Sequence, residues 1–458
     1  MHFINRQTCN QQIGCVIEVE GRIDKERYVQ AAKLAMKAEP ILGCRFVERF
    51  WRPYWEPRSD LDPNSLEFFD CVETDEVEEA VIDFFVNRLC DPVRGPLFRI
   101  RLIRRPAREG APPEDVIAYK ISHVLGDWGG VRELSFAVNA IYKRLFDDPD
   151  YVPPVRPTWR SRASRSMRQV FRNMGWRQRL QVWKRGRKDF LKQSLWRLPF
   201  NNGPESNPTY VIKRIDAETT AKILKSAKAR RATLNEMLLA AYFRALCEWG
   251  GVADGTSLSM TDTIDLRHYL PGKRTESICN MSAPMAPLLQ HKVDEPFSDL
   301  VTRVVAEMRQ QKRSSPGLLP AAVIGAMFQT PFGLMANSFR KLLASTRAEG
   351  GSVPVLSDGG YIQMEVHGVD VKLTYGVGPV TYPPNIIFIT GIFRDVMIWT
   401  VGVCESAAPK AEIAGLLDRM EDLIVNASSV VADPASKLQT PSPPLSARSI
   451  PKAEAVAS

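Results

Sequence analysis

A histidine and an aspartate four residues apart lie between a predicted strand and a predicted helix. The apolar run Val116–Tyr119 is typical of a buried strand, and Val131–Leu145 places apolar residues on one helical face. Between them lies His123–Gly130, in which three of the residues are glycine. Glycine accepts backbone dihedrals that other residues avoid, and it lets a bound molecule approach the main chain closely. A strand that enters a helix through such a turn predicts an α/β layer, with His123 and Asp127 at its edge.

The chemistry of these two side chains indicates a general base and a positioning group. Neutral imidazole is well suited to take a proton from an alcohol or an amine near neutral pH. Asp127 is predicted to hold the turn shut by bonding to backbone amides or to an arginine elsewhere in the chain. The spacing alone also fits a buried histidine with a structural role, so other segments must decide between the two interpretations.

The composition is that of a soluble globular protein long enough for two or more cores. The chain has 458 residues, of which 44% are hydrophobic and 25% charged. Its eight cysteines form no Cys-x-x-Cys pair, and the other histidines are scattered singly, so neither a metal site nor a bound cofactor is predicted. No run reaches the ~18 apolar residues of a membrane span, and the first residues lack the apolar core of a signal peptide. We therefore expect a cytoplasmic protein with reduced thiols.

The net charge of +9 originates in one segment. Residues 156–197 contain 14 Lys and Arg and one acidic residue, Asp189, so the segment carries +13 and the remainder −4. Tryptophans at positions 159, 176, 183 and 196 are interleaved with the basic residues. The segment fits a solvated linker helix, a peripheral contact with an anionic membrane, or a contact with an acidic protein partner. Nucleic acid is disfavoured, because no recognition motif accompanies the charge.

Prolines and a short internal similarity divide the chain into two halves. The order strand, Ile-Asp, helix occurs at Val16–Glu26 and again at Val211–Glu218, which suggests a duplicated architecture. Prolines at 149, 153, 154 and 157 mark the boundary between the halves. The predicted units are an N-terminal subdomain at 1–150, a basic linker at 151–205, a C-terminal subdomain at 206–430 and a disordered tail at 431–458. The predicted fold class is α/β, with sheet and helix layers in each half.

Local signals also predict individual elements. Thr233 and Glu236 form a capping box, in which each side chain satisfies an orphan amide of the other residue. The remaining predictions are a hairpin at Arg45–Glu56, helices at Glu76–Leu89, Pro296–Arg313 and Lys410–Val425, and strands at Leu97–Ile103, Ser257–Ile264, Ile362–Val366, Ile386–Ile392 and Met397–Val403.

Five segments, taken in order, resemble the condensation-domain superfamily. That superfamily includes the condensation domains of nonribosomal peptide synthetases, polyketide-associated acyltransferases, wax ester synthases, alcohol acetyltransferases and chloramphenicol acetyltransferase. The segment His123–Gly129 is similar to its His-His-x-x-x-Asp-Gly signature, whose second histidine is catalytic. The other similar segments are Glu20–Asp24 with Pro40–Leu42, Asp265–Arg267 with Leu270-Pro271, Asn280, and Ser357–Gly359.

The resemblance implies two chloramphenicol acetyltransferase-like subdomains arranged as a V, with a tunnel between them. It implies that His123 lies midway along the tunnel, where a thioester donor and an acceptor arrive from opposite sides. It also pairs the motif aspartate with an arginine of the second half, so Asp127 and Arg267 are the expected pair, with Gly129 as structural support. Weaker candidates for substrate or oxyanion binding are Trp128, Asn280, Ser282 and Ser357.

The sequence departs from the family signature at two positions. Ser122 replaces the first histidine, and Trp128 stands where the family has glycine, with Gly129 one place later. A tryptophan ring at this position would either narrow the tunnel or point into the second half. In the later segment, Asp358 replaces an asparagine.

The resemblance implies an acyltransferase with His123 as general base and no acyl-enzyme intermediate. The donor would be acyl-CoA or a phosphopantetheine-linked acyl group on a carrier protein, and the acceptor a hydroxyl or amine of an apolar small molecule or lipid, in natural-product or lipid biosynthesis. The alternative is a non-catalytic binding or scaffold protein on the same fold, which Trp128 and Ser122 favour. A serine hydrolase is disfavoured by the absence of a Gly-x-Ser-x-Gly elbow. A duplicated V holds the whole site in one chain, so a monomer is expected.

Overall fold

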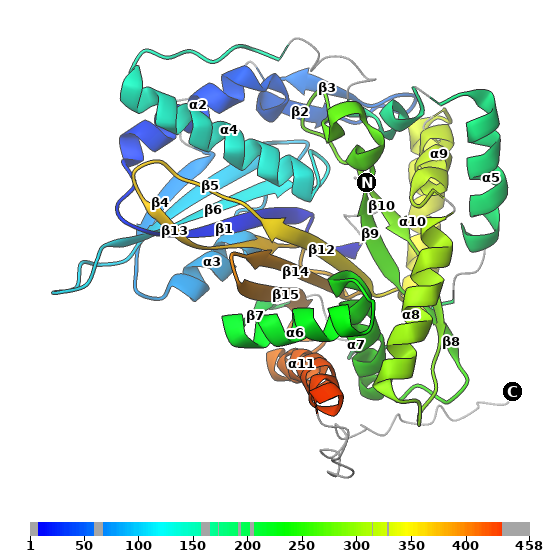
Figure 1. The fold of residues 1–458 in the computed structure, drawn as a ribbon. Helices are drawn as coiled ribbons and strands as arrows, with labels where there is room; N and C mark the ends of the chain where they lie inside the picture. The colour runs from blue at the N-terminus through cyan, green and yellow to red at the C-terminus, as the bar shows by residue number, and fades with distance from the viewer. Residues whose placement is uncertain are drawn as a thin grey trace, which may run out of the picture.

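Two mixed sheets, each covered by helices, form the body of the molecule (Figure 1). The computed structural model describes residues 8–432 apart from 59–66, 157–164, 173, 191–193, 202–205, 314 and 328. The predicted tail is outside the described residues from position 433 onward, and so are the four gaps between 157 and 205 in the predicted linker. Within the described chain, no helix has the length and apolar character needed to cross a membrane.

The first sheet carries the histidine at the end of its central strand. Its strands, in spatial order, are β13 (Asp370–Val377), β1 (Gln12–Glu20), β6 (Glu114–Ser122), β5 (Phe98–Arg104) and β4 (Phe69–Glu73). Helices α2 (Lys25–Ala38) and α4 (Trp128–Asp147) cover one face, and α3 (Val77–Val86) covers the other (Figure 1). Consecutive residues of β6 point to opposite faces of the sheet. The Tyr119 hydroxyl meets that of Tyr28 in α2, whereas the Lys120 ammonium donates to the Phe84 carbonyl of α3.

The second sheet lies in the C-terminal half. Its strands, in spatial order, are β10 (Ser282–Met285), β9 (Thr261–Asp265), β12 (Val355–Ile362), β14 (Ile387–Phe393), β15 (Val396–Cys404) and β7 (Pro208–Ile215). The helices packed with it are α6 (Ala217–Ala229), α7 (Leu234–Trp249), α8 (Phe297–Lys312) and α11 (Lys410–Ala432). The capping box predicted at Thr233 and Glu236 is confirmed and starts α7.

Strand β13 joins the two halves. In sequence it lies between β12 and β14, which pair with each other in the second sheet. In space it pairs antiparallel with β1 of the first sheet, from Gly14 opposite Val377 to Glu20 opposite Asp370. The predicted unit at 206–430 therefore contributes an edge strand to the sheet of the predicted unit at 1–150.

A third, smaller apolar cluster lies where the basic segment meets the C-terminal half. It combines the turn η3 (Met167–Phe171) and helix α5 (Trp176–Phe190) with α9 (Leu318–Met327), and its buried residues include Val170, Val182 and Leu318. Helix α10 (Phe332–Ala348) continues along the same end of the molecule (Figure 1). The described part of the basic segment is thus packed on the body of the protein.

Most element predictions are confirmed, with differences at the ends. The predicted hairpin is β2 (Cys44–Val47) with β3 (Tyr54–Pro57), and the predicted strand at 257–264 is divided into β8 (Ser257–Ser259), which pairs with β11 (Leu288–Gln290), and β9. The strand predicted at Ile362–Val366 is wrong, because β12 ends at Ile362. The last helix runs seven residues past the predicted end, from Val425 to Ala432. Strand β13 and helices α9 and α10 were not predicted.

Candidate active site

The turn between β6 and α4 is built from backbone hydrogen bonds and an aspartate cap. The His123 N–H donates to the Gln11 carbonyl at 2.8 Å, and the Leu125 N–H donates to the Ser122 carbonyl at 2.8 Å. Asp127 is the N-cap of α4, and its carboxylate accepts from the Gly130 N–H at 3.0 Å. The aspartate thereby satisfies one of the amides that a helix start leaves without a partner.

The same carboxylate is clamped to the second half of the chain. Arg267, in the turn η4 (Leu266–Tyr269), donates from Nη1 to Asp127 Oδ2 at 2.9 Å and from Nη2 to Oδ1 at 2.8 Å. The Met281 N–H donates to Oδ2 at 2.7 Å, and Arg267 also donates to the Cys279 carbonyl at 2.9 Å. Burial alone would raise the pKa of Asp127, but the guanidinium and the amide donors outweigh burial and hold this pKa below its ordinary value. A buried, bidentate ion pair therefore ties the histidine turn to the loop before β10.

Gly129 makes room for this ion pair. A Cβ atom at position 129 would lie 2.5 Å from Cζ and 2.5 Å from Nη1 of Arg267, closer than any side chain tolerates. The guanidinium therefore lies directly against the first turn of α4, and only glycine permits that approach.

The imidazole of His123 is held through one of its two nitrogens. Nδ1 lies 3.0 Å from the Gly126 carbonyl oxygen, which can only accept, so this contact is a hydrogen bond when Nδ1 carries the proton. Asn280 Nδ2 lies 3.1 Å from His123 Nδ1. The same Asn280 Nδ2 donates to the His123 carbonyl oxygen at 3.3 Å, so it has an acceptor other than the ring. The Asn280 amide is oriented by the Ser282 N–H, which donates to its oxygen at 3.1 Å. We assign the Nδ1–H tautomer, which leaves the lone pair of Nε2 without a partner in the described part of the chain.

The surroundings of His123 favour a neutral ring. Burial lowers the pKa of His123 below its ordinary value, although the Asp127 charge and two backbone acceptors oppose the shift. The residue nevertheless keeps some solvent exposure, as does Trp128. A neutral imidazole with an available Nε2 and partial access from outside is the state that a general base needs at pH 7.

Trp128 points toward the strands of the second half. Its ring atoms lie 3.4 Å from the position of a Cβ at Gly359 of β12 and 3.2 Å from one at Gly376 of β13. Two glycines in neighbouring segments thus leave space for the indole, at the place where β13 crosses to the first sheet.

The two serines suggested for oxyanion binding lie on the second sheet. Ser282 begins β10 opposite Asp265, and Ser357 of β12 accepts a hydrogen bond from the Thr263 hydroxyl at 2.9 Å. In the described residues, neither serine hydrogen-bonds to His123; Asn280, two residues before Ser282, is the candidate that contacts the imidazole.

No protein-family model matches the sequence, and no curated protein does either. Solved structures match almost the whole chain. The first condensation domain of the CDA synthetase is 15% identical, with a TM-score of 0.68 over 94% of each chain. The trichothecene 15-O-acetyltransferase TRI3 from Fusarium sporotrichioides is 15% identical, with a TM-score of 0.64 over 92% of each chain. The X-domain from teicoplanin biosynthesis, in its complex with OxyB, is 15% identical, with a TM-score of 0.58 over 93% of this chain and 90% of that one.

The chain has the condensation-domain fold. The resemblance found in the sequence is therefore confirmed at the level of architecture, including the division into two halves. At these identities the likeness concerns the fold, and the roles of individual residues rest on the geometry described above.

Sequence reasoning missed several residues that complete the histidine turn of this condensation-domain fold. Arg165 donates to the Leu125 carbonyl at 3.1 Å, and burial lowers the pKa of its guanidinium to about 10. Glu133 lies 3.6 Å from Arg267 Nε and accepts from the Thr275 hydroxyl at 3.1 Å. These residues have no motif, and their contacts join parts of the chain 40 or more residues apart, so no local signal pointed to them.

Proposed function

We propose that the protein is an acyltransferase that moves an acyl group from a thioester to a hydroxyl or amine acceptor. The observation that carries this proposal is the imidazole of His123, which is held through Nδ1 with Nε2 available, on a turn fixed by Asp127 and Arg267. The fold shared with an acetyltransferase and with condensation domains supports the same reaction class.

In the proposed step, His123 Nε2 accepts the proton of the acceptor as its oxygen or nitrogen bonds to the thioester carbonyl carbon. The tetrahedral intermediate then breaks its C–S bond, and the leaving thiolate takes the proton from the imidazolium. The acyl group ends on the acceptor, the donor leaves as a free thiol, and no bond forms to the protein. Asp127 and Arg267 are positioning residues, because they fix the turn and do not reach the reacting atoms.

The donor is proposed to be acyl-CoA or an acyl group on the phosphopantetheine of a carrier protein, bound as a co-substrate. The acceptor is proposed to be an apolar small molecule or a lipid. These proposals rest on the resemblance to acyl-transferring relatives, and a tunnel past His123 with Trp128 beside it remains a prediction.

The test replaces His123 by alanine and follows thiol release from a panel of acyl-CoA and acyl-carrier-protein donors, with alcohols and amines as acceptors. We expect His123→Ala to lose at least about 100-fold in kcat/KM, the usual contribution of a general base. His367→Ala, which removes an exposed histidine from the segment between β12 and β13, is the matched control and should keep full activity.

The pH profile supplies a second measurement. Because burial lowers the pKa of His123, the wild-type kcat/KM should be constant at neutral pH and should fall only below the ordinary histidine pKa of about 6.5. Undiminished turnover by His123→Ala, or a fall centred above that pH, would exclude His123 as the base.

The second candidate function is a non-catalytic binding protein on the same fold. Trp128 favours it, because a bulky ring occupies the motif position where the resembling family has glycine, beside Gly359 and Gly376. The similarity to an X-domain solved in complex with OxyB is compatible with such a role. Acceptor-dependent release of thiol from any donor of the panel excludes this candidate.

A further inference from the structure

Helix α5 turns an apolar stripe toward solvent. Trp176 is 70% exposed, Leu180 42% and Trp183 52%, and their spacing of four and three residues places all three on one face of the helix. Val182 on the inner side is only 6% exposed and belongs to the apolar cluster that includes α9. The helix is therefore anchored by one face while the face with the two tryptophans points outward.

Cations surround the stripe, and acidic groups are scarce near it. Residues 166–184 contain five Lys and Arg and no Asp or Glu. Arg172 pairs with Glu276 at 2.5 Å, whereas Arg179 donates to the backbone carbonyls of Phe171 and Met174. Of these five cations, Arg172 alone has a carboxylate partner among the described residues. Most of the positive charge is therefore not neutralised by ion pairs.

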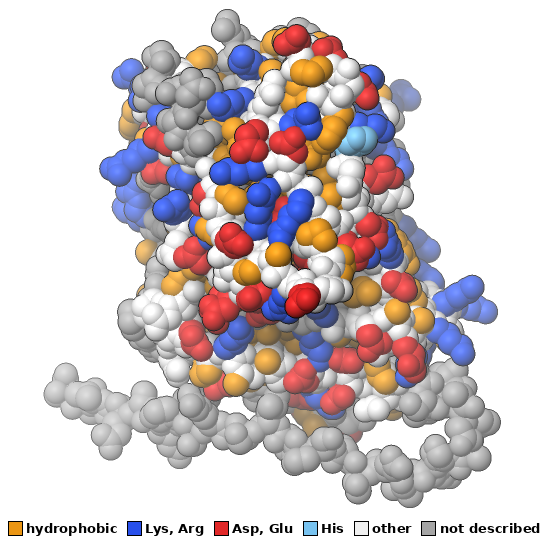
Figure 2. Space-filling model, turned by 90° about the vertical axis from the view of Figure 1, so that its left-hand side faces the viewer, with side chains coloured by type: hydrophobic (Ala, Val, Ile, Leu, Met, Phe, Trp, Pro, Cys, Tyr) orange, Lys and Arg blue, Asp and Glu red, His pale blue; other side chains and the backbone are white. Residues whose placement is uncertain are grey.

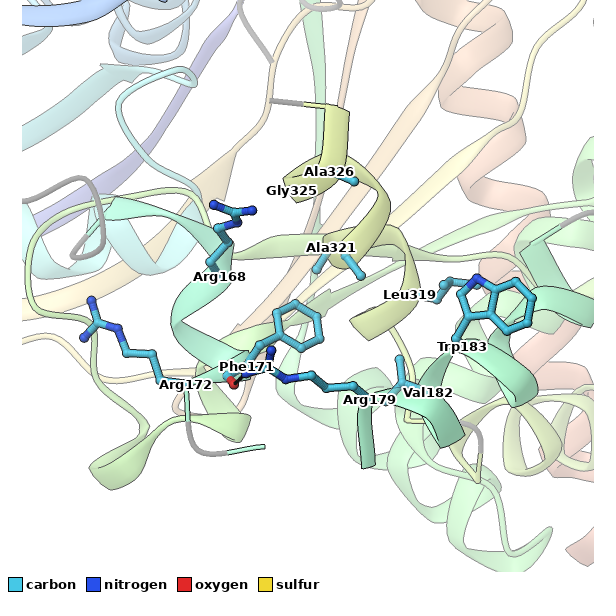
Figure 3. A pocket seen from close by; sticks show the side chains of 11 residues that line it. Arg168, Phe171, Arg172, Arg179, Val182, Trp183, Leu319, Ala321, Gly325 and Ala326 are labelled. Atoms are coloured by element: carbon cyan, nitrogen blue, oxygen red, sulfur yellow. Dashed lines mark hydrogen bonds between the residues drawn. The ribbon is translucent and has the colours of Figure 1, made fainter. Parts of the chain in front are cut away.

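An apolar groove opens beside the stripe, between η3, α5 and α9 (Figure 3). Its volume is about 460 Å³, and small residues such as Ala321, Gly325 and Ala326 form one wall. Arg168, Arg172 and Arg179 line it together with Phe171 and Trp183. The volume is in the range of small-molecule sites, about 300–1,000 Å³. A partner helix is about 10–12 Å wide with side chains, so the groove would hold only about one turn of it.

We propose that this end of the molecule, formed by η3, α5 and α9, binds an anionic phospholipid membrane. The tryptophans and Leu180 insert at the level of the headgroups, the arginines meet lipid phosphates, and the groove receives part of an acyl chain. A partner helix fits less well, because the groove would hold only about one turn of it. The inference does not depend on the proposed chemistry, although it would place a lipid acceptor near the enzyme.

The opposite face of the protein differs in its charge pattern. Figure 2 shows the side of the molecule that is at the left of Figure 1, away from α5, and there basic and acidic side chains are interspersed. Such a surface has no large region of positive charge that would attract an anionic membrane. The charge pattern therefore orients the protein with α5 toward the lipid.

The experiment is co-sedimentation of the full chain with vesicles of phosphatidylcholine alone and of phosphatidylcholine mixed with phosphatidylserine, an anionic lipid of the cytoplasmic leaflet. We expect binding to the anionic vesicles at low salt and a progressive loss as salt rises. Trp176→Ala with Leu180→Ala should weaken binding at least about tenfold, because two apolar side chains no longer insert. Arg177→Gln and Lys184→Gln should each cost about fivefold.

The control substitution is Phe146→Ala, which removes an aromatic side chain that is 40% exposed, about as much as Leu180, from the last turn of α4, away from α5. It should leave vesicle binding unchanged, and so should His123→Ala, even if His123 proves not to be the base. Absence of binding to anionic vesicles at low salt, or an equal loss in Phe146→Ala, would overturn the proposal. Capture by an acidic acyl carrier protein without vesicle binding, sensitive to Trp176→Ala, would assign the surface to a protein partner instead.

Discussion

The position of Arg267 depends on the missing side chain of Gly129. Arg267 reaches Asp127 from the second half of the chain by lying flat against the start of α4. Asp127 then has four donors, two from the guanidinium and two backbone amides, and each fixes the turn that carries His123. The absence of a side chain at Gly129 therefore allows Arg267 of the second half to reach Asp127, on the turn that carries the candidate base.

We predict that Gly129→Ala destabilises the protein and lowers kcat, because the new methyl group displaces the guanidinium. Overpacking of this kind costs about 2 kcal/mol in the free energy of unfolding. Gly130→Ala is the matched control: its Cβ would meet its nearest neighbours at 3.3 Å or more, and alanine suits a helix better than glycine. Urea unfolding and steady-state kinetics of both variants measure the effect, and equal behaviour of the two would contradict the close approach.

Helix α7 shows how an element can be predicted while its buried polar contacts are not. The capping box and the apolar residues of α7 were visible in the sequence, and the helix is buried along most of its length. At its start, Asn235 donates to Asp262 of β9 at 2.9 Å, while Asp262 Oδ1 has no partner in the described chain. Burial raises the pKa of Asp262 to about 7; the bond from Asn235 opposes this shift, and the nearby Asp358 charge adds to it.

This pKa predicts a loss of stability as the pH rises. In the unfolded chain Asp262 titrates near 3.9, so between about pH 4 and pH 7 only the folded state holds the proton. The contribution to folding is present at low pH and is lost as the pH rises toward 7. Asp262→Asn should therefore gain stability over wild type from pH 5 to pH 8, by on the order of 3 kcal/mol at the upper end.

Thermal and urea unfolding at pH 5 and pH 8 measure this difference. Asp395→Asn, which changes an exposed carboxylate in the turn between β14 and β15, is the control and should follow wild type at both values. A pH-independent difference between Asp262→Asn and wild type would show that Asp262 is ionised throughout this range in the folded protein.

In the molecule as a whole, β13 makes the two halves interdependent. The strand returns from the C-terminal half to pair with β1 along seven residue pairs, and Trp128 lies against Gly376 within it. Without β13, one edge of β1 would be left open, and unpaired edges promote association with other chains.

We predict that a fragment of residues 1–156 does not fold cooperatively, although it contains the whole histidine motif. The full chain should unfold in urea in one transition reported alike by circular dichroism and tryptophan fluorescence. A fragment with a sharp unfolding transition of its own, or two separate transitions in the full chain, would show that the halves are independent domains.

Elements that depend on neighbours in sequence could be predicted from the sequence alone. The strand and helix on either side of His123, the helix start at Asp24 and the capping box at Thr233 follow from periodicity and capping, which act within a few residues. The resemblance added the pairing of Asp127 with Arg267, because a family signature carries long-range information that periodicity does not.

Other features were decided only by the tertiary structure. Strand β13 was not predicted from the sequence, and its pairing with β1 of the first sheet follows only from the tertiary structure. The contact of Asn280 with His123 and the direction of Trp128 depend on how the two halves pack. Local preferences of the chain are set by residues close in sequence, whereas the partner of a strand edge or of a buried polar atom is set by segments far away along the chain.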